Sequence, residues 1–217
     1  MTTQEKSLSM SLLERDLVPD WLIRRQIRQL LAQRLTEEDK GDPESQQRHL
    51  MGMVLKLRES PIAIHTAEAN VQHYEVPTDF YLKSLGKHLK YSSCYFDDFE
   101  ISRAAQNLDA AEARMLALTC ERAALKDGER ILELGCGWGS LSLWMAAHYP
   151  NSRITVVSNS KTQKAHIDGQ AAARGLTNLE VITCDVNALD FPASKKFDRV
   201  VSVEMFEHMR NYQTLLA

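Results

Sequence analysis

The 217-residue sequence has few of the residues that mark specialised classes of protein. It contains only four cysteines, six prolines and nine glycines, and 7% of its residues are aromatic. The cysteines are scattered, with no Cys-x-x-Cys pair and no histidine cluster at metal-ligand spacing, at positions Cys94, Cys120, Cys136 and Cys184. This argues against a disulfide scaffold and against a metal site. We therefore expect reduced thiols, no bound metal and a cytoplasmic location.

Long apolar runs and a strong charge of one sign are also absent. The formal net charge is −3, so the overall composition does not indicate a nucleic-acid partner. No apolar run approaches the length of a membrane span, and the first ten residues lack the apolar centre of a signal peptide. We expect a globular protein without stable membrane insertion.

What the sequence does contain is a short apolar strand that runs into a glycine-rich turn and then a helix. Gly135, Gly137 and Gly139 form a GxGxG pattern, one residue tighter than the GxGxxG of dinucleotide-binding turns. Glu133, just before the turn, would repel a pyrophosphate but suits a ligand that carries an ammonium and a sulfonium. The pattern predicts S-adenosylmethionine as cofactor, although a tight turn without any ligand is the alternative.

From Gly128 onward, apolar strands alternate with helical stretches. Such alternation is typical of an α/β fold with a doubly wound, mostly parallel sheet. The predicted strands are 131–134, 154–157, 179–183 and 197–203, and the predicted helices are 140–148, 161–174 and, weakly, 186–189. Four strands fit the first part of such a sheet. We expect the C-terminal part of the sheet to be missing from this chain, and its activity alone to be weak.

The first part of the chain is predicted to be helical. A helix that begins near Asp20 has an apolar stripe and, opposite it, the arginines Arg24, Arg25, Arg28 and Arg34. This helix could lie on a membrane surface, but packing of the stripe on a neighbouring element is the more common arrangement. Further helices are predicted at 46–58, 63–72 and 102–124. We divide the chain into a helical region (1–72), a lid segment (73–126) and a Rossmann-like cofactor domain (127–217).

Polar residues follow the second and third predicted strands. Ser158 and Asn159, with Gln163 one helical turn later, could bind a ribose and the carboxylate of the ligand. Asp185 could accept a hydrogen bond from an adenine amino group while Val186 packs on the ring. Each group could instead be a helix cap. Because parallel strands end at the same edge of a sheet, we expect these residues to lie together there.

The fourth predicted strand leads into a group of titratable residues. Glu204, Glu207 and His208 have i, i+3, i+4 spacing, which would place them on one face of a helical turn. Two carboxylates and an imidazole could hold a cationic amine and accept its proton. The alternative is a solvated helix start whose acids complement the helix dipole.

With these residues in place, the chain resembles the cyclopropane fatty acid synthase superfamily of S-adenosylmethionine-dependent methyltransferases, and within it the coclaurine N-methyltransferase branch. The resemblance covers residues from about His73 to the end. It depends on the ordered motifs QHYEVPTDFY, LGKHLKYSSCYF, ELGCGWGSLSL, SNSxxQ and VEMFEHMRNY. It implies a class I methyltransferase fold with an N-terminal helical cap.

The resemblance also assigns roles to individual residues. It implies that Tyr91 and Ser92 close over the cofactor and that Gly135 and Gly137 hold its amino-acid part. Binding of the ribose and adenine is implied for the residues after the second and third strands, which are Ser158, Asn159, Gln163, Asp185 and Val186. The catalytic residues would be Glu204, Glu207 and His208.

Two positions separate the branches of this superfamily. Cyclopropane synthases have a bicarbonate-binding Cys where this chain has Ser93, and Gly where it has Glu204. Both differences favour methylation of a small-molecule amine. A lipid-modifying cyclopropane synthase and a non-catalytic cofactor-binding or interaction protein are the alternatives, and a homodimer is left open.

Overall fold

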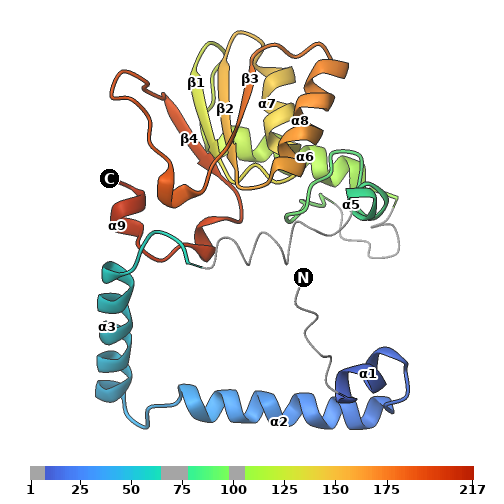
Figure 1. Ribbon diagram of the computed structural model, residues 1–217, viewed down its shortest axis with the longest axis vertical. Coiled ribbons are helices and arrows are strands. Elements are labelled where there is room, and N and C mark those ends of the chain that lie inside the picture. The colour runs from blue at the N-terminus through green and yellow to red at the C-terminus, as the bar shows by residue number, and fades with distance from the viewer. Residues whose placement is uncertain (1–7, 65–77, 98–105) are drawn as a thin grey trace. The chain divides into compact units, whose positions relative to one another are not determined.

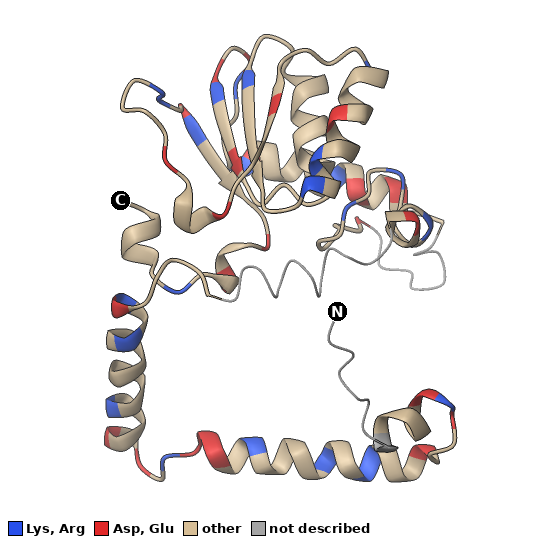
Figure 2. Ribbon diagram, viewed as in Figure 1, with Lys and Arg blue, Asp and Glu red and all other residues tan. Residues whose placement is uncertain are grey.

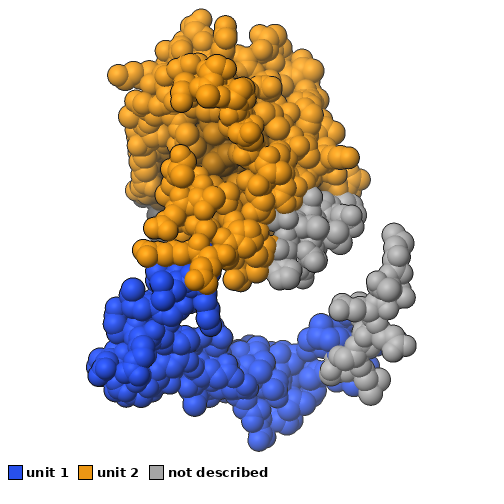
Figure 3. Space-filling view, turned by 60° about the vertical axis from the view of Figure 1, so that its left-hand side comes forward, with its two compact units in different colours: residues 1–57 blue, residues 58–217 orange. Residues whose placement is uncertain are grey.

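The computed structural model describes residues 8–64, 78–97 and 106–217. By its internal contacts the chain divides into two compact units, residues 1–57 and 58–217 (Figure 3). The predicted boundary at residue 72 and the motif residues 73–77 lie outside the described residues.

The first unit consists of helices. They are α1 (Leu8–Glu14), α2 (Asp20–Glu38) and α3 (Pro43–Glu59), which ends at the boundary with the second unit. None of the residues of α2 is buried, and Leu35 is 73% exposed, so the predicted packing of its apolar stripe is not seen within this unit. Figure 2 shows the basic residues along α2; two of them pair with acids one turn away, Arg24 with Asp20 and Arg34 with Glu38. Among the described helices, none combines the length and apolarity needed to cross a membrane.

The second unit is built on a four-stranded parallel sheet with strand order β3-β2-β1-β4 (Figure 1). Its strands are β1 (Arg130–Leu134), β2 (Arg153–Ser158), β3 (Leu179–Thr183) and β4 (Arg199–Ser202). Glu133 lies opposite Val156 on one side and Val201 on the other, so β1 is central. The predicted α/β fold with a parallel sheet is confirmed.

Helices and short 3-10 turns precede, connect and follow these strands. They are α5 (Thr78–Ser84), α6 (Leu108–Arg122), α7 (Ser140–His148), α8 (Lys161–Ala173), η2 (Val186–Ala188), η3 (Phe206–His208) and α9 (Tyr212–Leu215). The predicted helix 140–148 has the bounds of α7. The predicted helix 186–189 is only a 3-10 turn, because Asp185 caps it and Leu189 is already extended.

The main core lies between the sheet and helices α6, α7 and α8. Alternate strand residues such as Ile131, Ile154 and Val156 meet Leu116 of α6 and Ile167 of α8, and all five are at most 1% exposed. Because side chains alternate along a strand, the intervening residues point to the opposite face. This burial fixes the positions of the loops that leave the strands.

The opposite face of the sheet has a smaller cluster. Leu132, Leu134 and Val157 are buried there against partly buried residues from connecting segments, including Phe191, Phe197 and Met205. The predicted fourth strand began at Phe197, but β4 begins at Arg199. Phe197 instead packs edge-on against Phe191 in the preceding loop.

Candidate functional site

The glycine turn after β1 has a packed side and an open side. The backbone N–H groups of Gly135 and Cys136 both donate to Val157 O, which ties the turn to the end of β2. A Cβ atom at Gly135 would lie 2.9 Å from Met205, and one at Gly139 would lie 2.6 Å from Ile167. A Cβ at Gly137 would meet no atom within 4 Å. Gly137 is therefore where the backbone leaves space for a ligand.

All three glycines have positive φ angles, of 79° at Gly135, 51° at Gly137 and 83° at Gly139. This region is costly for residues with a side chain, because the Cβ approaches the backbone carbonyl. The turn leads directly into α7, which begins at Ser140. The backbone N–H groups of the first turn of α7 therefore lie at a helix N-terminus, where anionic ligand groups are favoured.

Glu133 lies beneath this turn as a buried acid. It is 2% exposed, and its Oε2 accepts a 2.6 Å hydrogen bond from Ser142 Oγ on α7. Burial raises the pKa of Glu133 to about 7, while the Ser142 hydrogen bond and the charge of Lys90 act in the opposite direction. Glu133 therefore contributes a negative charge next to the turn that depends on pH.

The residues after β2 differ in burial: Ser158 and Gln163 are buried, whereas Asn159 is partly exposed. Ser158 Oγ donates to Gln163 Oε1 at 2.7 Å, and both residues are at most 5% exposed. Ser160 caps α8 by accepting from Gln163 N–H. Asn159, between them, is half-buried. The structure thus brings the three predicted residues together, with Ser158 and Gln163 supporting the turn that carries Asn159. Direct contact of any of them with a ribose stays a prediction.

After β3, Asp185 caps a 3-10 turn. Its Oδ1 accepts from the backbone N–H of Asn187 at 2.8 Å and from Asn187 Nδ2 at 3.0 Å. Val186 is 9% exposed at the same edge, and the N–H of Cys184 donates to Ser158 O, which places this turn beside the preceding one. The cap that the sequence left as an alternative is present. Binding of adenine stays a prediction.

Tyr91 and Ser92 belong to a loop that reaches the glycine turn through Tyr81. The ring of Tyr81 lies 5.3 Å from that of Tyr91 and 5.0 Å from that of Trp138, which is part of the glycine turn. Lys90 Nζ contacts Ser92 Oγ. The loop is thus held at the site where the resemblance places the cofactor.

The residues after β4 differ from the predicted geometry. Glu204 has a φ of 51°, and the only helical turn of the segment is η3, residues 206–208. Glu204, Glu207 and His208 therefore do not share one helical face, and that prediction is wrong. The cause is the left-handed backbone at Glu204, which breaks the helical spacing and allows Met205 to pack against Gly135. All three residues are exposed, and their catalytic role stays a prediction.

Glu204 makes a contact that the sequence did not reveal. Its Oε1 accepts a 2.9 Å hydrogen bond from the backbone N–H of Ser93, 111 residues earlier in the chain. Ser93 and Glu204 are the two positions at which the resemblance implies a difference from cyclopropane synthases. They meet where the loop of Tyr91 and Ser92 approaches the end of β4.

A second group that sequence reasoning missed surrounds Lys90. This lysine is 5% exposed, and burial lowers its pKa, whereas the charges of Cys94, Glu204, Glu112 and Glu133 act to raise it. The only sequence signal was a single lysine within an aromatic segment. Its burial between acids from three different elements is a tertiary feature.

Two asparagines position the segment 58–63 along the same edge. Asn187 exchanges hydrogen bonds of 3.0 Å with the backbone N–H and carbonyl of Ala63. Asn211, 8% exposed, donates to the carbonyls of Arg58 and Ser60, each at 2.9 Å. Segment 58–63 is thereby fixed to the turns that follow β3 and β4.

Comparisons with known proteins agree with this geometry. The (S)-coclaurine N-methyltransferase of Thalictrum flavum subsp. glaucum is 43% identical over 94% of this chain and 55% of its own length. The cyclopropane-fatty-acyl-phospholipid synthase of Escherichia coli is 35% identical over 67% of this chain and 35% of its own. The chain spans about half the length of the curated N-methyltransferases it matches.

Solved structures give the same result. A crystal structure of coclaurine N-methyltransferase bound to N-methylheliamine and SAH matches with a TM-score of 0.81 and 39% identity, over 95% of this chain and 57% of the other. The mycolic acid cyclopropane synthase CmaA1, complexed with SAH and CTAB, matches with a TM-score of 0.56 and 26% identity, over 68% of this chain and 48% of the other.

The sequence model of mycolic acid cyclopropane synthetase matches residues 63–216, which include the whole sheet and every residue predicted for the site. The chain therefore belongs to the cyclopropane synthetase family of methyltransferases.

Proposed function

We propose that this protein is an S-adenosylmethionine-dependent N-methyltransferase that acts on the amine of a small molecule. The observation that carries the proposal is the hydrogen bond between Ser93 N–H and Glu204 Oε1. This hydrogen bond joins the loop predicted to close over the cofactor to Glu204, one of the residues predicted to bind the amine. Ser93 and Glu204 are also the two positions at which this chain differs from cyclopropane synthases according to the resemblance. The similarity to coclaurine N-methyltransferases supports it further.

The glycine turn fits this cofactor. The open space at Gly137, the positive φ angles and the helix N-terminus at Ser140 suit the amino-acid part of S-adenosylmethionine. Asn159 and Asp185, at the ends of β2 and β3, would bind its ribose and adenine, supported by Ser158, Gln163 and Val186. When bound, the cofactor supplies an electrophilic methyl group.

The residues of this chain would then prepare the amine. An amine attacks a sulfonium methyl through its lone pair, so it must lose its proton. Glu207 and His208, both exposed beside β4, would accept that proton, and Glu204 would orient the cation. Alignment of the two reactants can contribute roughly 7–11 kcal/mol to such a displacement.

We also propose the three-part organisation into residues 1–72, 73–126 and 127–217. A small-molecule partner, the absence of a nucleic-acid partner, a cytoplasmic location and a homodimer stay predictions.

Two measurements test this proposal. Calorimetry should detect S-adenosylhomocysteine binding that Gly137→Val abolishes, because a branched side chain would fill the space at Gly137. Mass spectrometry of an amine library incubated with S-adenosylmethionine should detect added methyl groups. A cyclopropane product from unsaturated phospholipids, with no methylated amine, would assign the protein to the lipid-modifying branch. Cofactor binding without any product would favour a non-catalytic role.

A further inference from the structure

A cavity lies beside the site described above. Its volume is about 590 Å³, within the usual range of small-molecule sites. None of the residues predicted to bind the cofactor or the amine lines it. The cavity is partly open to solvent, and its described lining residues come from α7, α8, the segment 82–89 and the start of α6, with Trp138 from the glycine turn.

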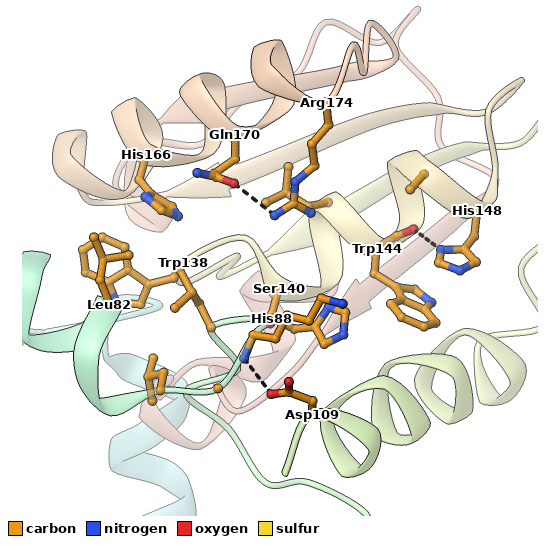
Figure 4. A pocket seen from close by; sticks show the side chains of 16 residues that line it. Leu82, His88, Asp109, Trp138, Ser140, Trp144, His148, His166, Gln170 and Arg174 are labelled. Atoms are coloured by element: carbon orange, nitrogen blue, oxygen red, sulfur yellow. Dashed lines mark hydrogen bonds between the residues drawn. The ribbon is translucent and has the colours of Figure 1, made fainter. Parts of the chain in front are cut away.

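One face of α7 and one face of α8 line this cavity. Ser140, Trp144 and His148 recur at intervals of four residues on α7, and His166, Gln170 and Arg174 recur in the same way on α8 and its C-terminal cap. Residues four apart lie on one helix face. Figure 4 shows the α8 residues facing His88 and Asp109 across the cavity, with Trp144 and Ser140 between them.

The described residues of this lining include two tryptophans and three histidines, beside aliphatic side chains such as Leu82 and Leu143. The rings of Trp144 and His148 are stacked, with centroids 4.0 Å apart and planes at 19°. His88 meets Trp144 edge-on at 5.4 Å, and Trp138 meets His166 edge-on at 5.5 Å. Such walls favour a flat, aromatic ligand, which can stack on or pack edge-on against them.

The charged groups of the cavity favour an anion. Arg174 Nη2 donates to Gln170 Oε1 at 3.0 Å, and no carboxylate of the described residues forms an ion pair with Arg174. Lys87 adds a second cation. Among the described lining residues the acid is Asp109, which accepts a 3.0 Å hydrogen bond from the backbone N–H of Lys87. Behind the lining, Glu112 Oε2 accepts a 2.8 Å hydrogen bond from the backbone N–H of His88.

The charge of Arg174 affects the pKa of two histidines that line the cavity. Burial lowers the pKa of both His88 and His166, and the charge of Arg174 also acts to lower both. At His88 the charges of Glu112 and Asp109 act in the opposite direction. Arg174 therefore acts on both walls of the cavity. In addition, His166 Nε2 is buried and has no hydrogen-bond partner among the described residues.

We propose that this cavity binds a small planar aromatic anion, such as an aryl carboxylate, with its ring against Trp144 and the histidines and its acid group on Arg174. A planar guanidinium is suited to carboxylate recognition, and its hydrogen bonds to a carboxylate are stronger than those between neutral groups. The proposed contacts involve none of the residues predicted to bind the cofactor or the amine, so the proposal does not depend on the proposed function.

The test compares two probes of similar shape, 1-naphthoate and the neutral 1-naphthalenemethanol, by calorimetry on the whole chain. Naphthoate should bind about tenfold more tightly than the alcohol. Arg174→Gln should remove that difference by weakening naphthoate alone. Arg153→Gln, a matched change of an exposed arginine at the start of β2, should have no effect.

Further variants locate the probe. Trp144→Leu should weaken both probes, whereas Trp21→Leu, at a 64% exposed tryptophan on α2, should weaken neither. Gln170→Glu, which would pair a carboxylate with Arg174, should weaken naphthoate and so replaces Arg174→Gln if that variant fails to fold. No naphthoate binding, equal binding of both probes, or unchanged naphthoate affinity in the folded Arg174 or Gln170 variant would overturn the proposal.

Discussion

Two layers of residues at the carboxyl edge of the sheet differ in what they contact. The inner layer, with Ser158, Gln163, Glu133 and Gly139, is buried or tightly packed and directed at other parts of the chain. The outer layer, with Gly137, Asn159, Glu204, Glu207 and His208, has open space beside it or is at least partly exposed. Residues of the two layers alternate along the sequence, as Gly137 and Gly139 do. Position in the sequence therefore does not show to which layer a residue belongs.

This difference teaches that one motif can serve stability and function at once. In the glycine turn, Gly139 is required because Ile167 occupies the space of a side chain, whereas Gly137 borders space that only a ligand would fill. We therefore expect changes in the inner layer to lower the free energy of unfolding. Changes in the outer layer should lower binding or turnover instead.

The largest effect is expected for Glu207→Ala and His208→Ala. Loss of a positioned proton acceptor costs on the order of 100-fold to 10,000-fold in rate. Both side chains are exposed, so melting temperatures and S-adenosylhomocysteine affinity should change little. Steady-state turnover of an accepted amine checks this. At raised pH, activity of His208→Ala should recover, because bulk water then removes the proton. Full activity of both variants would show that these residues are not catalytic.

Gly139→Ala should have the next largest effect, this time on stability. Its Cβ would lie 2.6 Å from Ile167 at a φ of 83°. Overpacking and left-handed strain together cost about 2–5 kcal/mol. Gly137→Ala, the matched control, has the strain without the clash and should cost about 1–2 kcal/mol. Urea unfolding measures both. Equal losses would contradict the distinction between the two sides of the turn.

A pH-dependent effect is expected at Glu133. Its folded-state pKa of about 7 lies above the ordinary value of 4.5, so the folded protein holds more protons between these values. Stability should therefore fall as pH rises through this window, by about 3 kcal/mol, from 1.36 kcal/mol per pKa unit. Glu133→Gln should remove this fall. Urea unfolding at pH 5 and pH 8 checks it, and an identical pH dependence in the variant would assign the effect to other groups.

Much of the fold could be predicted because local patterns determined it. Apolar strands between helical stretches gave the parallel sheet, and the spacing within Ser140–His148 gave α7 with its observed bounds. The prediction that Glu204, Glu207 and His208 lie on one helical turn was wrong, because the spacing of these residues contains no information on the backbone φ angle of Glu204. The positive φ at Glu204 accompanies the packing of Met205 against Gly135, which is a contact between elements.

Contacts across long sequence distances were not predictable. The bond from Ser93 to Glu204 and the burial of Lys90 both depend on the loop before α6 approaching the end of β4. Likewise, Trp144 and Arg174 line one cavity because α7 and α8 face each other, and local sequence patterns do not determine how two helices face each other. Packing between elements, rather than preference within them, decides such contacts.

The smallest effect is expected for Glu204→Gln, which separates the two roles of this residue. Glutamine keeps an oxygen that can accept from Ser93 N–H, so the loop of Tyr91 and Ser92 should stay in place and cofactor affinity should be unchanged. The negative charge that would orient a cationic amine is lost, and we expect KM for the amine to rise about tenfold, equivalent to about 1.4 kcal/mol, with kcat lowered less. Glu204→Ala should also release Ser93 and weaken S-adenosylhomocysteine binding. Steady-state kinetics with calorimetry distinguishes the two variants. If Glu204→Gln lowers kcat as strongly as His208→Ala does, Glu204 takes part in proton transfer and its role in orienting the amine is wrong.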